Sequence, residues 1–339
     1  MTGVGMDWSL GELGRMFGGE IAGDPDRRFR LVSIDTVDPD GIALCENQGY
    51  LARSGGVGAL LLPMHLSGDD RPHIRVPDPR RAFRRLLAES ERPLPLRAGI
   101  HPTAVVDDAA DVHPSASIGA YAVVEAGAVI GPEVRVFPFC YVGDGCRIGE
   151  QSVVYPHAVL LRNVLVGVRC RIHPGAVLGA EGFGFERDDA GWHRVPHVGF
   201  VRLGDDVEVR ALASVERATC GTTEIGDGSK IGNLVQVGHN AQVGSHTVLA
   251  PMSGVGGSST LAPGTVLGGQ AGVGDHVEVS SGVQLAAASC TTRDIRRAGV
   301  YAGSPARPLA QQHRLDATAP YLPAILDRLR RLENDREAE

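Results

Sequence analysis

The sequence predicts a mainly β protein whose largest part is a parallel β-helix. An aliphatic residue recurs at every sixth position from Ile225 to Leu285, and a small residue follows each one four places later. A second run with the same step extends from Ile100 to Leu178. A period of six fits neither a 3.6-residue helix nor simple strand alternation. It is typical of hexapeptide repeats, in which each repeat forms one short strand and one turn.

Three hexads per coil give a three-sided prism, in which residues separated by three hexads lie on the same corner of successive rungs. Parallel strands lie about 4.8 Å apart, so each coil rises by that amount. The aliphatic residues are expected to point into the prism, and the small residues to fit near its corners. Cys140, Cys146 and Cys170 occupy the small inward position, so we interpret them as packing residues.

This stacking places two histidines on one corner. His239 follows Val237 by two residues, and His276 follows Val273 by three. Two full coils separate these valines, so the imidazoles are expected roughly 10 Å apart along the axis. Gly256-Gly257 lies on the rung between them. Two histidines that flank exposed glycine backbone are compatible with a reaction site, but their positions alone favour solvated turn histidines.

Composition and charge exclude several classes of protein. The chain has 339 residues, enough for two or three domains, and its net charge of −7 argues against a nucleic-acid binder. No apolar run reaches the roughly 18 residues of a transmembrane span, and the N-terminus lacks the pattern of a signal peptide. The six cysteines form no C-x-x-C pair. We therefore expect a reduced, cytoplasmic protein.

Residues 1–98 lack the six-residue period and predict a small α/β domain. SLGELGRMF has helical spacing with Ser9 as its N-cap, and Asp78-Pro79 begins a second helix. FRLVSIDTV and VGALLLP have the composition of strands. Pro93 and Pro95 mark the linker to the repeats.

Residues 99–290 are expected to form the β-helix domain, with about nine coils. The period breaks at residues 180–200, a glycine- and aromatic-rich insertion. An insertion in a prism must project from it as a loop, and such loops often form binding faces.

Residues 291–339 predict a C-terminal extension with an α-helix from Pro320 to Arg331. The helix would carry an apolar stripe formed by Leu322, Ile325, Leu326, Leu329 and Leu332. Its positive charge comes from Arg328, Arg330, Arg331 and Arg336. We expect the helix to cap the open end of the coil and to pack with its counterparts in an oligomer; a binding role could coexist with this.

Five segments together resemble one hexapeptide family. They are IGNLVQVGHNAQVG at 231–244, GGQAGVGDHVEV at 268–279, GAEGFGF at 179–185, SVERAT at 214–219 and GVYAGSPA at 299–306. This pattern is similar to that of the UDP-3-O-acylglucosamine N-acyltransferase family of lipid A biosynthesis, and the likeness covers nearly the whole chain. The resemblance implies a left-handed β-helix. It also implies transfer of a 3-hydroxyacyl chain from acyl carrier protein to the 2-amine of a 3-O-acylated UDP-glucosamine.

The resemblance also implies roles for single residues. His239 matches the family's general base, and the backbone N–H of Gly257 matches the group that faces the thioester oxygen. His276 matches the second histidine of the active site, and Asn233 the asparagine of the motif. In the first domain, LCENQGY resembles the uracil-binding segment. Asn47 and Tyr50 therefore take its asparagine and tyrosine.

Three positions depart from the family's pattern. Leu44 stands where an aromatic residue is usual, and Gly232 and Glu216 each replace an aspartate. We expect these changes to affect the stacking of uracil, the positioning of the substrate and the choice of acyl chain length more than the reaction class. No G-x-S-x-G elbow is present, which favours direct attack of the amine on the thioester.

We expect a homotrimer, because three prisms packed side by side would let each corner with His239 face a neighbouring subunit, and closed cyclic symmetry is common among oligomers. The resemblance implies acyl carrier protein and a UDP-sugar as partners. It implies no metal ion, and no cofactor apart from the phosphopantetheine thioester of the donor. Two alternatives remain open at this stage. One is a hexapeptide acyltransferase that uses a coenzyme A thioester on another amino sugar. The other is a metal-dependent trimer resembling γ-class carbonic anhydrases, although His239 and His246 fall on successive corners.

Overall fold

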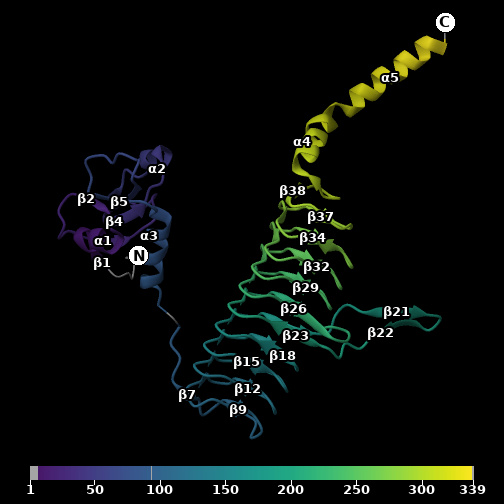
Figure 1. Ribbon diagram of the computed structural model, residues 1–339, viewed down its shortest axis with the longest axis horizontal. Helices are drawn as coiled ribbons and strands as arrows, with labels where there is room; N and C mark the ends of the chain where they lie inside the picture. Colours follow the sequence, from purple (N-terminus) through teal and green to yellow (C-terminus); the bar gives the residue numbers. More distant parts are fainter. Residues whose placement is uncertain (1–6, 93, 338–339) are drawn as a thin grey trace. The chain divides into compact units, whose positions relative to one another are not determined.

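The six-residue period folds into a prism of three parallel β-sheets (Figure 1). The computed structural model describes residues 7–92 and 94–337, without the side chains of 332 and 334–337. Val237 pairs with Val255, and Val255 with Val273, so the register advances by three hexads per coil. The predicted β-helix is confirmed, and sheets of 12, 10 and 9 strands agree with about nine coils.

Each sheet takes every third strand of the solenoid. The 12-stranded sheet contains β7 (Gly99–Ile100), β10 (Ser117–Ile118), β13 (Arg135–Val136), β16 (Val153–Val154), β19 (Arg171–Ile172), β24 (Glu208–Val209), β27 (Lys230–Ile231), β30 (Val248–Leu249), β33 (Val266–Leu267), β36 (Val283–Leu285), β38 (Gly299–Ala302) and β39 (Arg307–Pro308). The ten-stranded sheet contains β8 (Val105–Val106), β11 (Val123–Val124), β14 (Tyr141–Val142), β17 (Val159–Leu160), β20 (Val177–Ala180), β25 (Ser214–Glu216), β28 (Gln236–Val237), β31 (Gly254–Val255), β34 (Gly272–Val273) and β37 (Cys290–Thr291). The nine-stranded sheet contains β9 (Asp111–Val112), β12 (Val129–Ile130), β15 (Arg147–Ile148), β18 (Val164–Val166), β23 (Phe200–Leu203), β26 (Thr222–Ile225), β29 (Gln242–Val243), β32 (Thr260–Leu261) and β35 (Glu278–Val279).

The interior of the prism forms one continuous apolar core. The aliphatic residues that keep the six-residue step from Ile118 to Leu285 are buried in it, whereas Ile100 in the first coil is 51% exposed. Cys140, Cys146 and Cys170 are buried free thiols, as their inward position predicts. Burial raises the pKa of Cys140 to about 12, and the pKa values of Cys146 and Cys170 to about 11. These thiols therefore act as small apolar residues.

The insertion forms an antiparallel hairpin that extends from the side of the solenoid (Figure 1). It consists of β21 (Phe185–Asp188) and β22 (Gly191–Arg194), between β20 and β23. The side chains of β21 and Trp192, His193 and Arg194 of β22 are exposed. The base of the hairpin, in contrast, folds back onto the solenoid through backbone bonds from Val198 to Thr219 and from Gly199 to Ala218, both 2.9 Å.

The first unit of the chain, which ends at Pro95, has a six-stranded sheet of its own. In spatial order its strands are β1 (Asp7–Ser9), β3 (Arg28–Leu31), β4 (Asp38–Leu44), β5 (Val57–Pro63), β6 (His73–Val76) and β2 (Glu20–Ala22). Its helices are α1 (Leu10–Phe17), α2 (Gln48–Arg53) and α3 (Pro79–Ser90).

Two predicted helix starts of this unit are confirmed. Ser9 caps α1 in a reciprocal capping box with Glu12, and Asp78 caps α3 with Pro79 as its first residue. Leu10 and Leu13 of α1 pack with Phe29 of the sheet in one core. The apolar faces that the spacing predicted therefore build a small α/β unit.

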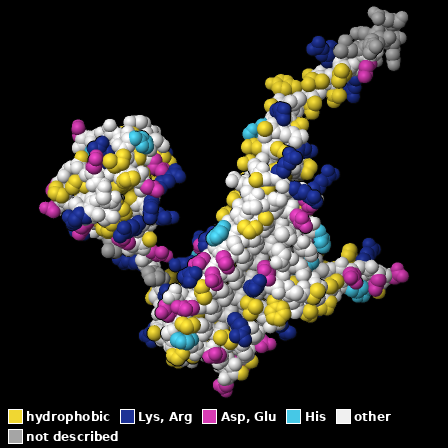
Figure 2. All heavy atoms as spheres, viewed as in Figure 1, with side chains coloured by type: hydrophobic (Ala, Val, Ile, Leu, Met, Phe, Trp, Pro, Cys, Tyr) yellow, Lys and Arg dark blue, Asp and Glu magenta, His cyan; other side chains and the backbone are white. Residues whose placement is uncertain are grey.

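The C-terminal extension differs from the single predicted helix. It contains α4 (Leu309–Thr318), a 3₁₀ turn at Ala319–Tyr321 and α5 (Leu322–Glu337). It is α4 that contacts β38 and β39 at the end of the coil. The apolar stripe of α5 is exposed, with Leu322, Ile325, Leu326 and Leu329 between 44% and 52% accessible; Figure 2 shows this apolar surface in yellow. Within one chain the stripe therefore covers nothing, and the side chains of Leu332 and Arg336 lie outside the described part.

None of the helices in the described residues has the length and apolar composition needed to span a bilayer.

Candidate active site

The turns that follow the strands of the ten-stranded sheet bring the candidate residues together. We call this edge of the prism the reaction corner. His239 follows β28, Gly257 follows β31, and His276 follows β34. In register, His239, Gly257 and Asp275 are equivalent positions on three successive rungs, and Asn240, Ser258 and His276 are the next. The three members of the second set all have left-handed backbone, with φ between 58° and 61°. The corner thus orders these residues along one line.

The imidazole of His239 lies against Gly257 on the next rung. A Cβ atom added at Gly257 would lie 2.8 Å from Nε2 of His239, closer than atoms approach. Gly257 does not have positive φ, so its glycine is explained by this contact and not by backbone strain. Only glycine leaves the ring in its place and Nε2 at the Gly257 backbone.

Asn240 fixes which nitrogen of His239 carries the proton. Its Nδ2 donates to the carbonyl of Cys220 at 2.8 Å, and its Oδ1 accepts the Thr219 N–H at 3.0 Å. Oδ1 also lies 3.1 Å from Nδ1 of His239. Because Oδ1 can only accept, Nδ1 of a neutral His239 must donate, and Nε2 keeps its lone pair. His239 in this tautomer therefore carries its lone pair on the nitrogen that lies at Gly257.

Glu216 holds the turn of His239 from the preceding rung. Its Oε2 accepts the His239 N–H at 3.1 Å, and its Oε1 accepts from Gln236 at 2.6 Å. Glutamate, which departs from the family's pattern here, thus serves as an acceptor for the turn. Gly232, the other departure in the repeats, has no room for a side chain, because a Cβ would lie 2.6 Å from the Pro251 nitrogen.

The backbone N–H of Gly257 already has an acceptor. It donates to Oδ1 of Asp275 at 2.8 Å. Two further aspartates make the same kind of bond, from Val168 N–H to Asp205 and from Asp205 N–H to Asp227. The bond is thus a recurring feature of the solenoid. An oxyanion that uses Gly257 N–H must compete with this carboxylate.

His276 is exposed two rungs from His239. Its own N–H donates to the Gly257 carbonyl at 2.9 Å, which ties its turn to the glycine rung. The imidazole is therefore accessible to a ligand lying along the corner.

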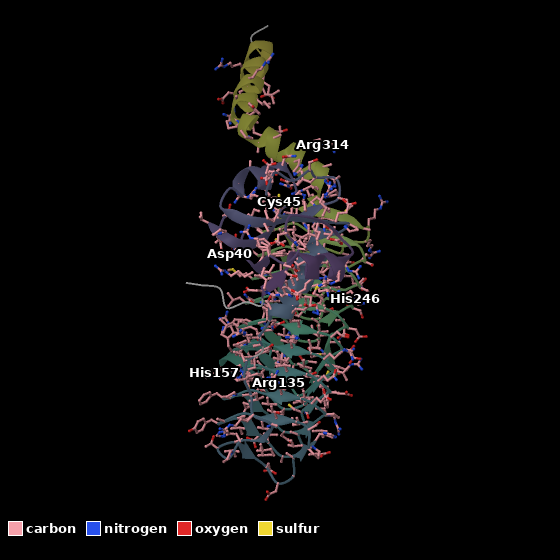
Figure 3. The ribbon with its side chains drawn as sticks, turned by 90° about the vertical axis from the view of Figure 1, so that its left-hand side faces the viewer. Asp40, Cys45, Arg135, His157, His246 and Arg314 are labelled. Carbon is pink, nitrogen blue, oxygen red and sulfur yellow. The ribbon has the colours of Figure 1, made fainter. Side chains whose placement is uncertain are left out.

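Asn233 and His246 lie on the other two corners. Asn233 follows β27 of the 12-stranded sheet, and His246 follows β29 of the nine-stranded sheet. Figure 3 shows His246 on the opposite side of the solenoid from His157, which, like Asn233, follows a strand of the 12-stranded sheet. Within one chain, the prism does not bring Asn233 to His239.

Asn47 and Tyr50 belong to the first unit, at the start of α2. Asn47 is the N-cap, and its Oδ1 accepts the Tyr50 N–H at 3.1 Å. The guanidinium of Arg53 lies 5.7 Å from the centre of the Tyr50 ring. Leu44, at the end of β4, is half-buried against the core of this unit. Asn47 thus has a structural task of its own, while its amide nitrogen remains on an exposed side chain.

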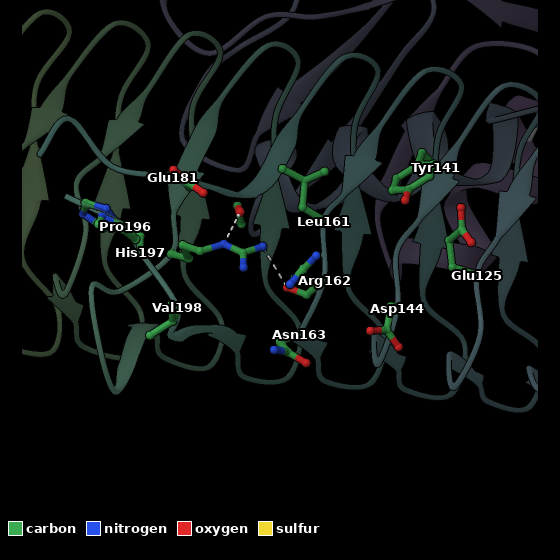
Figure 4. A pocket seen from close by; sticks show the side chains of 12 residues that line it. Glu125, Tyr141, Asp144, Leu161, Arg162, Asn163, Glu181, Pro196, His197 and Val198 are labelled. Atoms are coloured by element: carbon green, nitrogen blue, oxygen red, sulfur yellow. Dashed lines mark hydrogen bonds between the residues drawn. The ribbon is translucent and has the colours of Figure 1, made fainter. Parts of the chain in front are cut away.

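A cavity of about 580 Å³ opens on the reaction corner, on the rungs before His239 (Figure 4). Arg217 lines this cavity and is only 5% exposed. Its Nε donates to the Gly179 carbonyl at 2.7 Å, and its Nη2 to the Arg162 carbonyl at 3.0 Å. Burial and the neighbouring Arg162 lower the pKa of Arg217. The base of the hairpin, with Glu181 and His197, forms one wall of this cavity.

The sequence reasoning missed the orienting role of Asn240. Its adjacency to His239 in the V-G-H-N segment was the available signal, but the contacts with Thr219 and Cys220 come from an aperiodic segment. In the described residues, no three or more His, Cys, Asp or Glu side chains group as a metal site would require.

Similar proteins were found by sequence over almost the full length of the chain. A family model described as bacterial transferase hexapeptide (six repeats) matches residues 127–162 and 222–257. UDP-3-O-acylglucosamine N-acyltransferase of Delftia acidovorans is 38% identical over 335 residues, 96% of this chain and 94% of the relative. The enzyme of the same name from Pseudomonas aeruginosa (strain UCBPP-PA14) is 37% identical over 333 residues, 97% of this chain and 94% of the relative.

Solved structures share the fold at lower identity. UDP-N-acetylglucosamine acyltransferase of Arabidopsis superposes with a TM-score of 0.57 at 22% identity, over 63% of this chain and 75% of that chain. The acyltransferase from Bacteroides fragilis 9343 has a TM-score of 0.51 at 19% identity, over 62% and 73%. These neighbours support the hexapeptide solenoid.

Proposed function

The chain belongs to the UDP-3-O-acylglucosamine N-acyltransferase family, and we propose that His239 is the general base of its acyl transfer. The protein is an acyltransferase, and the names of its relatives point to lipid A biosynthesis. Its acceptor is the 2-amine of a UDP-3-O-acylglucosamine. The observation that carries the assignment is the hydrogen-bond network of Asn240, which leaves the lone pair of His239 Nε2 at the Gly257 rung.

The reaction follows from this geometry as a direct attack. The amine nitrogen forms a bond to the thioester carbon while Nε2 of His239 takes its proton. The negative charge moves to the thioester oxygen, where a backbone N–H can stabilise it by about 3 kcal/mol. Collapse of the intermediate breaks the carbon–sulfur bond, and the proton held by His239 passes to the leaving thiolate. No enzyme nucleophile is needed, and the imidazole ends the cycle neutral.

We assign the oxyanion contact to Gly257 N–H. Nε2 of His239 lies against the backbone of Gly257, so the proposed base and this N–H border the same turn, and glycine permits close approach of the backbone to a ligand. Asp275 must release or share the N–H when the oxyanion forms. His276, exposed on the following rung, is assigned to the substrate, as a donor that positions it or binds its phosphates.

The first unit is assigned to the nucleotide. Asn47 uses Oδ1 for its helix, which leaves its Nδ2 amide to donate to a uracil carbonyl. Tyr50 adds a partly exposed aromatic ring beside it. Leu44 cannot stack as an aromatic residue would, so Tyr50 carries more of the contact with the base.

The donor and the assembly are part of the same proposal. We infer a 3-hydroxyacyl chain on the phosphopantetheine thioester of acyl carrier protein, with no further cofactor, and a homotrimer. Exposed Arg328, Arg330 and Arg331 on α5 offer a surface to an acidic carrier. A trimer would also give Asn233 a role, because a neighbour's corner could face His239. Six free cysteines, four of them buried, fit a cytoplasmic location.

An acyl-transfer assay read by mass spectrometry tests the proposal. The donors are 3-hydroxyacyl carrier proteins of several chain lengths and the matching coenzyme A thioesters, and the acceptors are UDP-sugars with and without the 2-amine and the 3-O-acyl chain. We expect an amide product only from carrier-bound donors with the 3-O-acylated amine. Faster transfer from coenzyme A would favour the other hexapeptide acyltransferases.

A further inference from the structure

The base of the hairpin places a second histidine against His239. The rings of His197 and His239 lie 5.0 Å apart, centre to centre, at an angle of 70°. This is the edge-to-face arrangement that aromatic rings prefer. His197 comes from the irregular segment between β22 and β23 that returns from the insertion to the solenoid, and it is only 3% exposed. The insertion thus contributes to the surroundings of the proposed base.

A hydrogen bond to its own segment orients the ring of His197. Nδ1 lies 2.9 Å from the carbonyl of Val195, so Nδ1 must donate, and Nε2 bears a lone pair. Nε2 is buried without a hydrogen-bond partner. A ring held by this bond therefore packs against the imidazole of His239.

Two glycines make room for this pair of rings. A Cβ added at Gly182 would lie 2.8 Å from Nε2 of His197 and 2.8 Å from Cδ2 of His239. A Cβ added at Gly184 would lie 2.7 Å from Cε1 of His197. The E-G-F-G segment of the insertion therefore fits around both histidines, and it would not accept larger residues without moving them.

We propose that His197 is a positioning residue for the general base. This rests on the proposed role of His239. The ring of His197 packs against that of His239 and prevents His239 from turning away from Gly257. The other charged groups near the pair are Glu216 at the His239 N–H, Asp275 at the Gly257 N–H, and Arg217 and Glu181 in the cavity wall. None of them packs a ring against His239, so this task belongs to His197.

Two substitutions separate the ring from its hydrogen bond. His197→Phe keeps an aromatic ring but loses the bond to Val195, and His197→Asn keeps a donor near the position of Nδ1 but loses the ring. We expect His197→Phe to retain kcat within a few-fold. His197→Asn and His197→Ala should lower kcat by about tenfold or more with little change in KM, because a small displacement of a catalytic group is costly. Trp192→Ala, at the exposed part of the same hairpin, is the matched control.

The double variant shows whether His197 acts through His239. In a His239→Ala background, His197→Ala should cause no further loss of kcat, because the two effects share one route. Melting temperatures identify variants that fail to fold. Wild-type kcat in a folded His197→Ala variant, or loss in His197→Phe with retention in His197→Asn, would overturn the proposal. A His239→Ala variant that keeps its rate would instead contradict the proposed role of His239 as base. Failure of the proposed function and failure of the role of His197 therefore give different results.

Discussion

Oδ1 of Asp275 accepts the backbone N–H of Gly257 at 2.8 Å. Gly257 lies one rung beyond His239, and Asp275 lies one rung beyond Gly257. This bond occupies the donor that the proposed mechanism assigns to the oxyanion. A carboxylate at this place also opposes a developing negative charge. In the proposed mechanism, the thioester oxyanion must therefore compete with the Asp275 carboxylate for the Gly257 N–H.

Neutralising Asp275 tests this competition. In Asp275→Asn the amide oxygen can still accept the N–H, but the charge that opposes the oxyanion is gone. We expect kcat to stay level or rise by several-fold, whereas Gly257→Ala should lower it by about 10²-fold because its Cβ would collide with Nε2 of His239. Steady-state kinetics on folded variants measures both. A large loss of kcat in Asp275→Asn would show that the carboxylate itself is required and would remove Gly257 N–H from the oxyanion role.

Removing the imidazole of His239 should have the largest effect on the chemical step. A lost general base typically costs about 10²–10⁴-fold in rate, so His239→Ala should lower kcat by that factor while KM changes little. His276→Ala should instead act mainly on KM. His246→Asn is the control, because His246 lies on another corner in left-handed backbone that asparagine accepts. The assignment fails if His239→Ala folds and keeps a near-normal kcat.

The repeat predicted most of the fold because one period fixes three structural features at once. Strand spacing, coil register and inward direction all follow from the six-residue step, so the rung relation of His239, Gly257 and His276 could be derived before the structure. The helix starts of the first unit follow a similarly local rule, because Ser9 and Asp78 cap their helices with their own side chains.

Contacts made by aperiodic segments could not be predicted in this way. The partners of Asn240 lie in the ERATCGTT segment, and the ring of His197 arrives from the insertion. Neither segment has a register relative to the coils until it is folded. The prediction that α5 covers the open end of the coil was wrong, since α4 makes these contacts. An apolar stripe indicates that a helix packs against a partner, but it does not identify the partner.

Asn47 has two functions that can be separated by substitution. Asn47→Asp keeps the oxygen that caps α2 but lacks an amide donor, and Asn47→Ala loses both. If the amide reads the uracil, both variants should raise KM for the UDP-sugar far more than they lower kcat. Only Asn47→Ala should also lower the melting temperature, through a capping loss of about 1 kcal/mol. Unchanged kinetics in Asn47→Asp would leave Asn47 with its structural role alone.

Glu208 should make the solenoid sensitive to acid. Its Oε1 accepts from His173 at 2.8 Å and from Arg210 at 2.7 Å, and these bonds, His173 first, lower the pKa of Glu208 from 4.5 to about 2. A carboxylate with a depressed pKa stabilises the fold fully above its unfolded pKa, and this contribution is lost as the pH falls through the folded value. The window is therefore between about pH 4.5 and pH 2.

Comparing the wild type with Glu208→Gln isolates this contribution. The wild type should be more stable at neutral pH by an amount on the order of 1–3 kcal/mol, and the difference should shrink below about pH 4.5. Urea unfolding at a series of pH values measures it, with Glu224→Gln as a control for an exposed pair with Arg202. A difference that does not depend on pH would mean that Glu208 contributes through packing alone.

The exposed stripe of α5 should separate assembly from carrier binding. Leu326 and Leu329 are 52% and 49% exposed in the single chain, so replacing both by Ser should cost the isolated fold little. If the stripes of three chains pack together, the double variant should dissociate at concentrations where the wild type sediments as a trimer.

Arg328→Glu with Arg331→Glu leaves the stripe intact and should raise KM for the acyl carrier protein, most strongly at low salt, since exposed charges are screened within about 10 Å at 0.1 M. Deletion of residues 320–339 should then produce both effects. A deleted protein that stays trimeric and keeps both its carrier affinity and its salt dependence would show that α5 serves neither purpose.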